Sequence, residues 1–218
     1  MHMRTLYTSP CTWYMLMIRK NLIKCKLNFT NTSGKHYFDS CMDSFCPEAE
    51  VCPCCNRKGD CVSHAFYKRR LLDFVNDRFF TSNLWILRVI CSCGATHAIL
   101  PDPIIPYRSY SLFFILAVLR DHFIHLIPIE TVCDKYSISV KTFYRWKDLF
   151  NQHRKEWLGL LVSMELDERR SLERLQEMES FADFAIAFFL QTGISFLQSH
   201  KNPAPYRRSC RGSPDFFR

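Results

Sequence analysis

The spacing of apolar residues changes near residue 108, and this change divides the chain into a strand-rich part and a helix-rich part. Three short runs rich in Val, Phe, Tyr, Trp and Ile predict strands at 62–67, 84–90 and 95–100. Turn-forming residues at 76–77 and 81–83 separate the first two runs. Three prolines make residues 101–107 an extended connector that cannot be helical.

Beyond residue 108 the apolar residues follow a helical period. Residues 111–126 carry them at i, i+3, i+4 and i+7, which predicts an amphipathic helix. A shorter helix is expected at 130–136, then a tight break at 137–139, then a helix at 140–152 for which Ser139 is a natural N-cap. The helical pattern continues through 156–164, and residues 171–180 read as a solvated helix face.

The remaining segments complete a four-part organisation. Residues 181–190 are apolar on all sides, but the following Gln191-Thr192-Gly193 interrupts the run, so a buried helix is favoured over a membrane span. We predict an α+β fold: a small β zinc ribbon, then an all-α region with a helix-turn-helix, then a basic tail. The expected boundaries are a poorly defined N-terminal arm at 1–50, the zinc-ribbon-like domain at 51–107, the helical domain at 108–200 with its helix-turn-helix at 129–152, and a disordered tail at 201–218.

Composition and charge narrow the possible classes. Apolar residues make up 48% of the 218 residues, which excludes disorder of the whole chain. A formal net charge of +8 permits a polyanionic partner without proving one. The twelve cysteines are clustered rather than spread, and no signal peptide is recognised at the N-terminus. Closely spaced cysteine pairs indicate metal ligands in a reducing compartment, so a cytoplasmic location is expected.

Two close cysteine pairs, about 35 residues apart, form the clearest chemical motif. Paired thiols joined by a β-hairpin are typical of a zinc ribbon, in which four thiolates hold a structural Zn²⁺. The predicted ligands are Cys52, Cys55, Cys91 and Cys93. The second pair has only one intervening residue, so its thiols converge only if the chain turns there. Alternative ligands are His64, His97 and Cys54, and a cluster of reduced thiols without metal is the competing interpretation. A catalytic zinc is disfavoured, because four thiolates leave no open position.

The two predicted helices around residue 138 have the form of a helix-turn-helix. The side chains expected to be buried are Val132, Cys133, Tyr136, Ile138, Val140, Phe143, Trp146 and Phe150. The outward side of the second helix is basic, as in a recognition helix that contacts DNA bases and phosphates. The predicted DNA-binding residues are Ser139, Lys141, Thr142, Tyr144 and Arg145. An ordinary antiparallel helix pair with a solvated face is the competing interpretation.

Both motifs also resemble known families. The sequence from Cys52-Pro-Cys-Cys55 through Cys91-Ser-Cys-Gly94 to Tyr110-Ser111 resembles a transposase-associated zinc-ribbon family of unknown function from bacteria and mobile elements. Residues 138–146, Ile-Ser-Val-Lys-Thr-Phe-Tyr-Arg-Trp, resemble the helix-turn-helix of insertion-sequence transposases. The resemblance implies the DNA-recognition parts of a transposition system, and it does not imply catalysis.

Several functions remain to be separated. Cut-and-paste transposases carry three carboxylates on an RNase H-like core of roughly 120 residues. Only 68 residues follow residue 150, and their pattern is helix and tail, so we expect no nuclease core and no enzyme activity. The leading expectation is a zinc-stabilised protein that binds double-stranded DNA, as an accessory factor or a truncated remnant. A separate transposase or a second copy of the chain are further candidate partners, and no membrane is expected. The alternatives are a transcription regulator, a zinc-ribbon module that binds protein, and, least favoured, a metal-dependent hydrolase.

Overall fold

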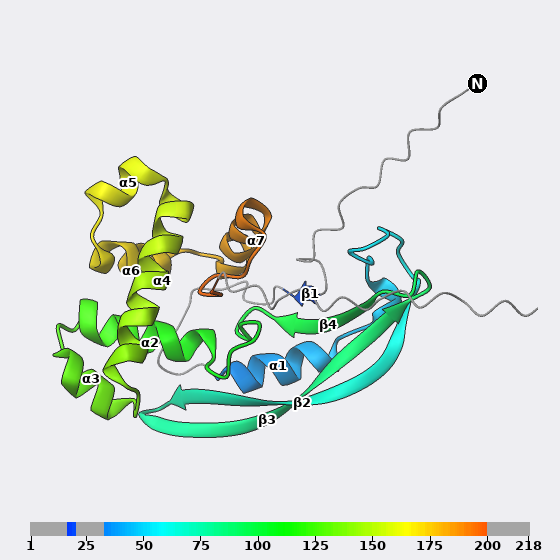
Figure 1. Cartoon of the computed structure of the whole chain (residues 1–218), viewed down its shortest axis with the longest axis horizontal. Coiled ribbons are helices and arrows are strands. Elements are labelled where there is room, and N and C mark those ends of the chain that lie inside the picture. Colours follow the sequence, from blue (N-terminus) through cyan, green and yellow to red (C-terminus); the bar gives the residue numbers. More distant parts are fainter. Residues whose placement is uncertain (1–16, 21–32, 200–218) are drawn as a thin grey trace, which may run out of the picture.

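A long two-stranded ribbon joins the two ends of the molecule (Figure 1). The computed structural model describes residues 17–20 and 33–199. Strand β2 (Cys61–Val75) pairs antiparallel with β3 (Arg78–Cys91) along their whole length. Asn76 and Asp77 form the two-residue turn between them, both with positive φ (50° and 57°), as the right-handed twist of a hairpin favours. The 15 residues of β2, at about 3.3 Å each, make the ribbon about 50 Å long.

The ribbon forms part of a four-stranded sheet in the order β1-β4-β3-β2. Strand β4 (Thr96–Pro101) pairs antiparallel with β3, and β1 (Met17–Lys20) lies parallel to β4. The mixed α+β fold class is therefore confirmed. The turn predicted at 81–83 is wrong, because these residues lie inside β3 and pair with 70–72 of β2 in unbroken register.

The buried face of the ribbon changes along its length. Leu84 and Ile86 are buried in a cluster with Phe38, whereas Leu87 and Val89 are buried in a different cluster with Cys52. Neighbouring residues of a strand point to opposite faces. The covered face of β3 therefore switches between residues 86 and 87, and no single alternating pattern describes this strand.

Helix α1 (Gly34–Asp43) covers one face of the sheet and lies in the segment for which we predicted only a loosely structured arm. Its N-cap, Ser33, accepts a hydrogen bond from the backbone N–H of His36. The buried carboxylate of Asp73 on β2 accepts further bonds from Ser33 Oγ (3.0 Å) and the N–H of Gly34 (2.6 Å). A buried acid thus fixes the start of α1 against the ribbon. A short 3-10 helix, η2 (Pro47–Ala49), leads to the first cysteine pair.

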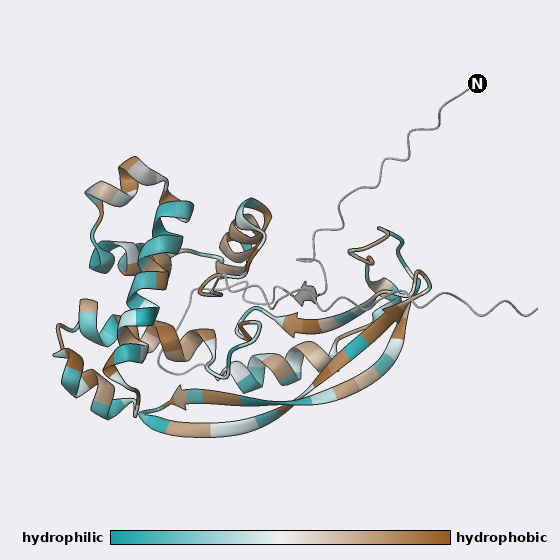
Figure 2. Cartoon of the chain, in the orientation of Figure 1, coloured by the Kyte–Doolittle hydropathy of each residue, from teal (hydrophilic) through white to brown (hydrophobic). Residues whose placement is uncertain are grey.

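Six helices of the described residues make up the opposite end of the molecule. They are α2 (Leu112–Phe123), α3 (Ile129–Lys135), α4 (Val140–Leu158), α5 (Leu160–Glu165), α6 (Glu168–Glu177) and α7 (Phe181–Thr192). Nearly every side chain of α2 is buried, and Figure 2 shows it as a hydrophobic element at the centre of this end. The helices predicted at 111–126 and 130–136 are confirmed with small shifts of their ends. The helix predicted at 140–152 is confirmed but continues to Leu158, so the helical segment predicted at 156–164 is divided between α4 and α5. Residues 171–180 are only partly a solvated face, because Leu172 and Leu175 of α6 are buried.

Helix α7 corresponds to the apolar run at 181–190, for which the sequence favoured a buried helix over a membrane span. It has 12 residues, and Phe181, Phe184 and Phe188 are buried against the other helices. Among the helices of residues 33–199, none has the length and apolar character needed to cross a membrane. The tail at 201–218 and most of the N-terminal arm lie outside the described residues.

Candidate functional site

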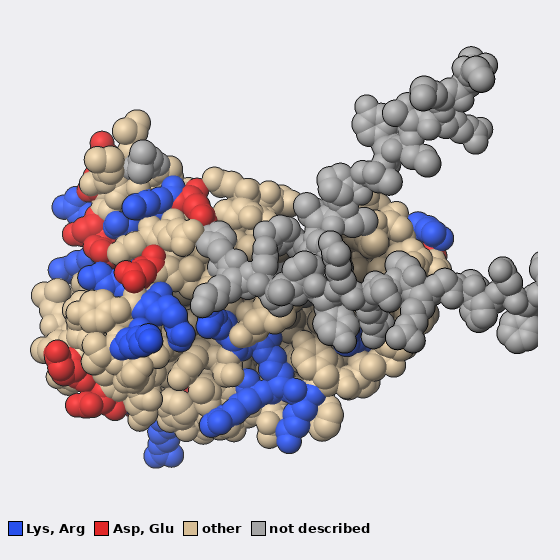
Figure 3. All heavy atoms as spheres, viewed as in Figure 1, with Lys and Arg blue, Asp and Glu red and all other residues tan. Residues whose placement is uncertain are grey.

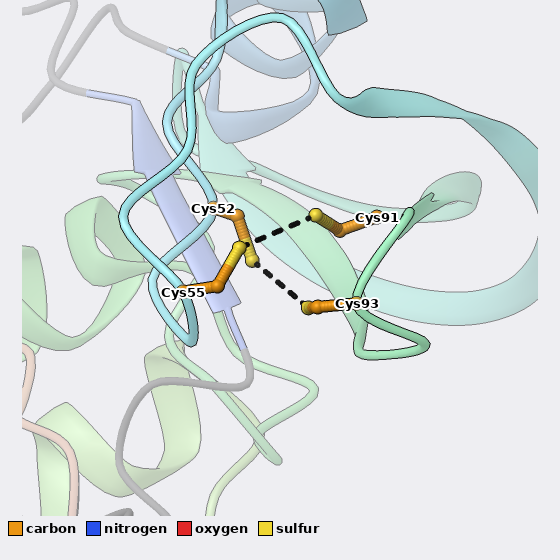
Figure 4. Close-up of side chains that lie close together, drawn as sticks. All are labelled: Cys52, Cys55, Cys91 and Cys93. Carbon is orange, nitrogen blue, oxygen red and sulfur yellow. Dashed lines mark hydrogen bonds between the residues drawn. The ribbon is translucent and has the colours of Figure 1, made fainter.

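The first cysteine pair lies in a tight turn before β2. The N–H of Cys52 donates to the carbonyl of Arg57 (2.9 Å), and the N–H of Asn56 donates to the carbonyl of Cys52 (2.8 Å). Asn56 has φ of 58°, in the left-handed region that asparagine tolerates. These bonds fold the backbone back on itself, so the side chains of Cys52 and Cys55 point to the same side (Figure 4).

The second pair lies where β3 ends. The N–H of Gly94 donates to the carbonyl of Cys91 (2.8 Å), and Gly94 has φ of 82°, which glycine adopts without a Cβ clash. The chain therefore turns immediately after Cys91 and carries Cys93 back toward it. In a straight strand the thiols of Cys91 and Cys93 would point to opposite faces, and this turn brings them to the same side.

The four predicted thiols lie together. Their sulfur atoms are all within 4.8 Å of one another, with 3.8 Å between those of Cys52 and Cys93 and 3.6 Å between those of Cys55 and Cys91 (Figure 4). Four sulfurs placed tetrahedrally at about 2.3 Å from one ion are separated by about 3.8 Å. The set therefore has the spacing of a four-thiolate metal site. None of the cysteines of the described residues forms a disulfide.

The surroundings of the cluster also suit a cation. Burial raises the pKa of the Cys52 thiol, whereas the backbone N–H of Cys93 lowers that of Cys91. Four thiolates this close repel one another, so a divalent ion is the physical means of keeping all of them ionised. Arg57 lies beside the cluster, and the negative charge of Cys55, followed by that of Asp60, raises its pKa. Asp60 accepts from Arg57 (3.2 Å) and from Ser92 Oγ (2.7 Å), which ties the two turns together.

The alternative ligands occupy different places. Nε2 of the fully buried His97 lies 3.3 Å from Cys52 Sγ, a hydrogen-bonding distance that places the imidazole beside the four sulfurs. His64 and Cys54 are exposed and are not members of the four-thiol group. Cys61 is fully buried and pairs with Cys91 across the ribbon, also outside that group.

At the other end of the ribbon, α3 and α4 form the helix pair that the sequence predicted. Tyr136, Phe143 and Trp146 are buried between them and α2. Ile138 is buried in the turn, and Ser139 caps α4 by accepting from the N–H of Thr142 (3.2 Å). Val140 is the exception among the side chains expected in the core, with 44% of its surface exposed. It stands at the first position of α4, on the outer side of the turn.

The predicted DNA-binding residues lie on the outer side of α4. Lys141, Tyr144 and Arg145 are exposed. Thr142 is half-buried, and its hydroxyl is 2.9 Å from that of Ser139. The two hydroxyl groups are thus engaged in capping the helix, whereas the three longer side chains project from it.

Arg108 and Arg69 are basic residues that the fold partly buries, which the sequence alone did not predict. Burial lowers the pKa of Arg108, and the positive charge of Arg145 lowers it further; the guanidinium of Arg108 also donates to Ser199 Oγ. Arg69 donates to the carbonyls of Ile105 and Arg108 and holds the 101–108 connector against the ribbon. Of the basic run at 68–70, Arg69 is therefore an internal clamp, while Lys68 and Arg70 are exposed.

A buried carboxylate that sequence reasoning missed supports the helix pair. Asp121 of α2 is 1% exposed and accepts from Lys135 Nζ (2.8 Å) and Tyr136 Oη (2.9 Å). Burial opposes its ionised form, but the bonds from Lys135 and Tyr136 outweigh burial and lower the pKa of Asp121. Lys135 also lies 3.5 Å from Asp77 at the tip of the ribbon. One polar network thus joins α2, α3 and the hairpin turn.

Comparison with known proteins gives one match. Residues 52–146 match the family model described as a domain of unknown function, DUF6431. The matched segment begins at the first cysteine of the cluster and ends within α4, so it contains the four thiols, α3 and the first turns of α4. No curated protein matches this chain, and no solved structure matches it either.

Proposed function

We propose that this chain is a metal-stabilised protein that binds double-stranded DNA, with α4 as the recognition helix. The observation that carries the proposal is the outer side of α4, where Lys141, Tyr144 and Arg145 project from a helix whose opposite side is packed into the core. In proteins that bind DNA in this way, the first turns of the second helix enter the major groove. A capped N-terminus also favours nearby phosphates through the helix dipole.

The charges around α4 support a polyanionic partner. The positive charge of Arg145 adds to burial in lowering the pKa of Arg108, and a bound phosphate would offset this unfavourable interaction. Figure 3 shows Lys and Arg side chains gathered along the ribbon, whereas at the helical end basic and acidic side chains are interspersed. Arg145 is exposed and has the length to reach a base edge or a backbone phosphate.

For the metal we propose Zn²⁺, held by Cys52, Cys55, Cys91 and Cys93. Soft thiolates in a closed tetrahedral set are the usual ligands of structural zinc, and the sulfur separations fit that geometry. A bound zinc supplies folding free energy rather than chemistry in such a site. The cysteine cluster and α4 lie at opposite ends of the ribbon, which fits a structural role for the metal.

We further propose that the protein recognises DNA without cutting it. In residues 151–199 the described elements are helices, and no strand there carries a set of carboxylates. The relation to insertion-sequence transposases, with a separate transposase or a second copy of this chain as a partner, is part of this proposal. So is the reducing, cytoplasmic location, which the free cysteines of the described residues support.

A selection experiment tests the proposed recognition. Wild-type protein, Arg145→Ala and the control Lys155→Ala would each be used to capture fragments from a random duplex library, followed by sequencing. Lys155 is an exposed base near the other end of α4. Wild type and Lys155→Ala should enrich the same short sequence, and Arg145→Ala should lose preference at one or two positions. Equal recovery of all sequences by wild type would refute the proposal.

A further inference from the structure

The outward face of the ribbon carries two exposed aromatic side chains. Phe66 on β2 and Trp85 on β3 are 61% and 59% exposed. Lys68 lies directly across from Trp85, and Arg70 lies two residues further along β2. Residues two apart on a strand share a face, as do residues directly across the ladder. Phe66, Lys68, Arg70 and Trp85 therefore form one surface, called here the stacking face, which ends beside Phe66 at its buried ladder partner Leu87.

The charge of the stacking face has one sign. Between residues 61 and 72 of β2, and throughout β3, the only ionised side chains are Lys and Arg, apart from the thiols of the metal site. The next acid along β2, Asp73, is buried and hydrogen-bonded to the start of α1. Figure 3 shows Lys and Arg gathered over the ribbon. A positive surface of this kind attracts a polyanion and repels a second copy of itself.

We propose that the stacking face binds single-stranded DNA. Unpaired bases have open π-faces that stack on exposed aromatic rings, whereas the bases of a duplex are already stacked on one another. Cations alternating with the rings are placed to meet the phosphates that link such bases. Strand β2 is the last strand in the sheet order, so within the described residues no further strand blocks the approach from its side. The chain would then hold a duplex at α4 and an unpaired strand on the ribbon.

The test measures binding of a fluorescein-labelled 12-nucleotide oligo(dT) by anisotropy. Loss of one stacking ring should weaken binding by between about 5-fold and about 150-fold, so Trp85→Ala should fall in this range. Trp85→Phe should retain most of the affinity. The control, Leu190→Ala, truncates a side chain on α7 that is 78% exposed and should have no effect. Circular dichroism and metal content would verify that each variant is folded.

The cations provide a second, independent measurement. Lys68→Ala combined with Arg70→Ala should reduce the slope of log affinity against log salt by about 1.4, because each phosphate contact on a single strand contributes about 0.7. Oligo(dT) affinity that is unchanged in both this double variant and Trp85→Ala would overturn the proposal. Tighter binding of oligo(U) RNA than of oligo(dT) would also overturn it, as would self-association that Trp85→Ala abolishes.

The binding of single-stranded DNA by the ribbon can be tested independently of the proposed recognition of duplex DNA by α4. Arg145→Ala should lose duplex selectivity and keep its affinity for oligo(dT), whereas Trp85→Ala should do the opposite. If α4 is only a packed helix, wild type shows no duplex selectivity while the oligo(dT) results stand unchanged.

Discussion

Replacing Asp73 by asparagine tests how α1 is attached to the ribbon. One carboxylate oxygen of Asp73 accepts from Ser33 Oγ and from the N–H groups of Gly34 and Lys35, at 3.0, 2.6 and 3.3 Å. The other accepts from Ser111 Oγ at 2.6 Å. The asparagine side chain would keep one accepting oxygen, so either the helix N-terminus or Ser111 loses its acceptor. The negative charge at the start of α1 is lost in both cases.

The expected cost follows from these contacts. A buried donor left without its acceptor costs about 1–3 kcal/mol, and loss of the charge at a buried helix N-terminus adds about 1 kcal/mol. Asp73→Asn should therefore lower the free energy of unfolding by about 2–4 kcal/mol. Urea unfolding at fixed pH and fixed free zinc measures this change. Asp39→Asn, which removes an exposed acid of the same helix, should cost less than about 1 kcal/mol. Equal stabilities for the two variants would refute the reasoning.

Three further outcomes are expected. Metal analysis should find about one zinc per chain in wild type. The zinc should be lost in Cys91→Ser and kept in Cys46→Ser, which changes an exposed cysteine outside the cluster. Wild-type protein that is folded but contains no metal would contradict this. The lowered pKa of Asp121 means that its stabilisation is present above its unfolded value of about 3.9 and is lost as pH falls through the lower folded value. Asp121→Asn should therefore flatten the acid side of the stability–pH curve, and parallel curves would argue against the network. Deleting residues 201–218, which carry five Lys and Arg, should weaken binding to all duplexes about equally and flatten the dependence of log affinity on log salt. A loss of affinity confined to one duplex sequence would contradict a role in phosphate contacts.

Much of the helical end could be predicted because its signals are local. The helical period from Leu112 onward and the capping serine at 139 each depend on neighbours within one or two turns. The four cysteines could also be predicted as one set, because two close pairs indicate a shared metal site, although the second pair converges only where the chain turns. Gly94 marks this turn by its conformational freedom.

The ribbon was predicted less well because its pattern depends on distant partners. Thr81, Ser82 and Asn83 are turn-forming types, yet they pair in β3 because Asn76-Asp77 supplies the tighter turn and the register then continues. The switch of the buried face after Ile86 arises from distant partners: Leu84 and Ile86 pack with Phe38 of α1, whereas Leu87 and Val89 pack with Cys52, and Met42 of α1 contacts both clusters. Nothing near Asp73 or Asp121 in sequence reveals the donors that they meet in the fold. The same holds for Arg69, whose carbonyl partners lie more than thirty residues away.

The central claim, that α4 recognises duplex DNA, is tested most directly by fluorescence anisotropy with the selected duplex and a scrambled duplex at several salt concentrations. Wild type should prefer the selected duplex, and Arg145→Ala should lose about 1–3 kcal/mol on it while changing little on the scrambled one. Lys155→Ala should retain the preference of wild type. If wild type and Arg145→Ala both bind the two duplexes equally, with the same dependence on salt, then α4 is only a packed helix and the claim is contradicted.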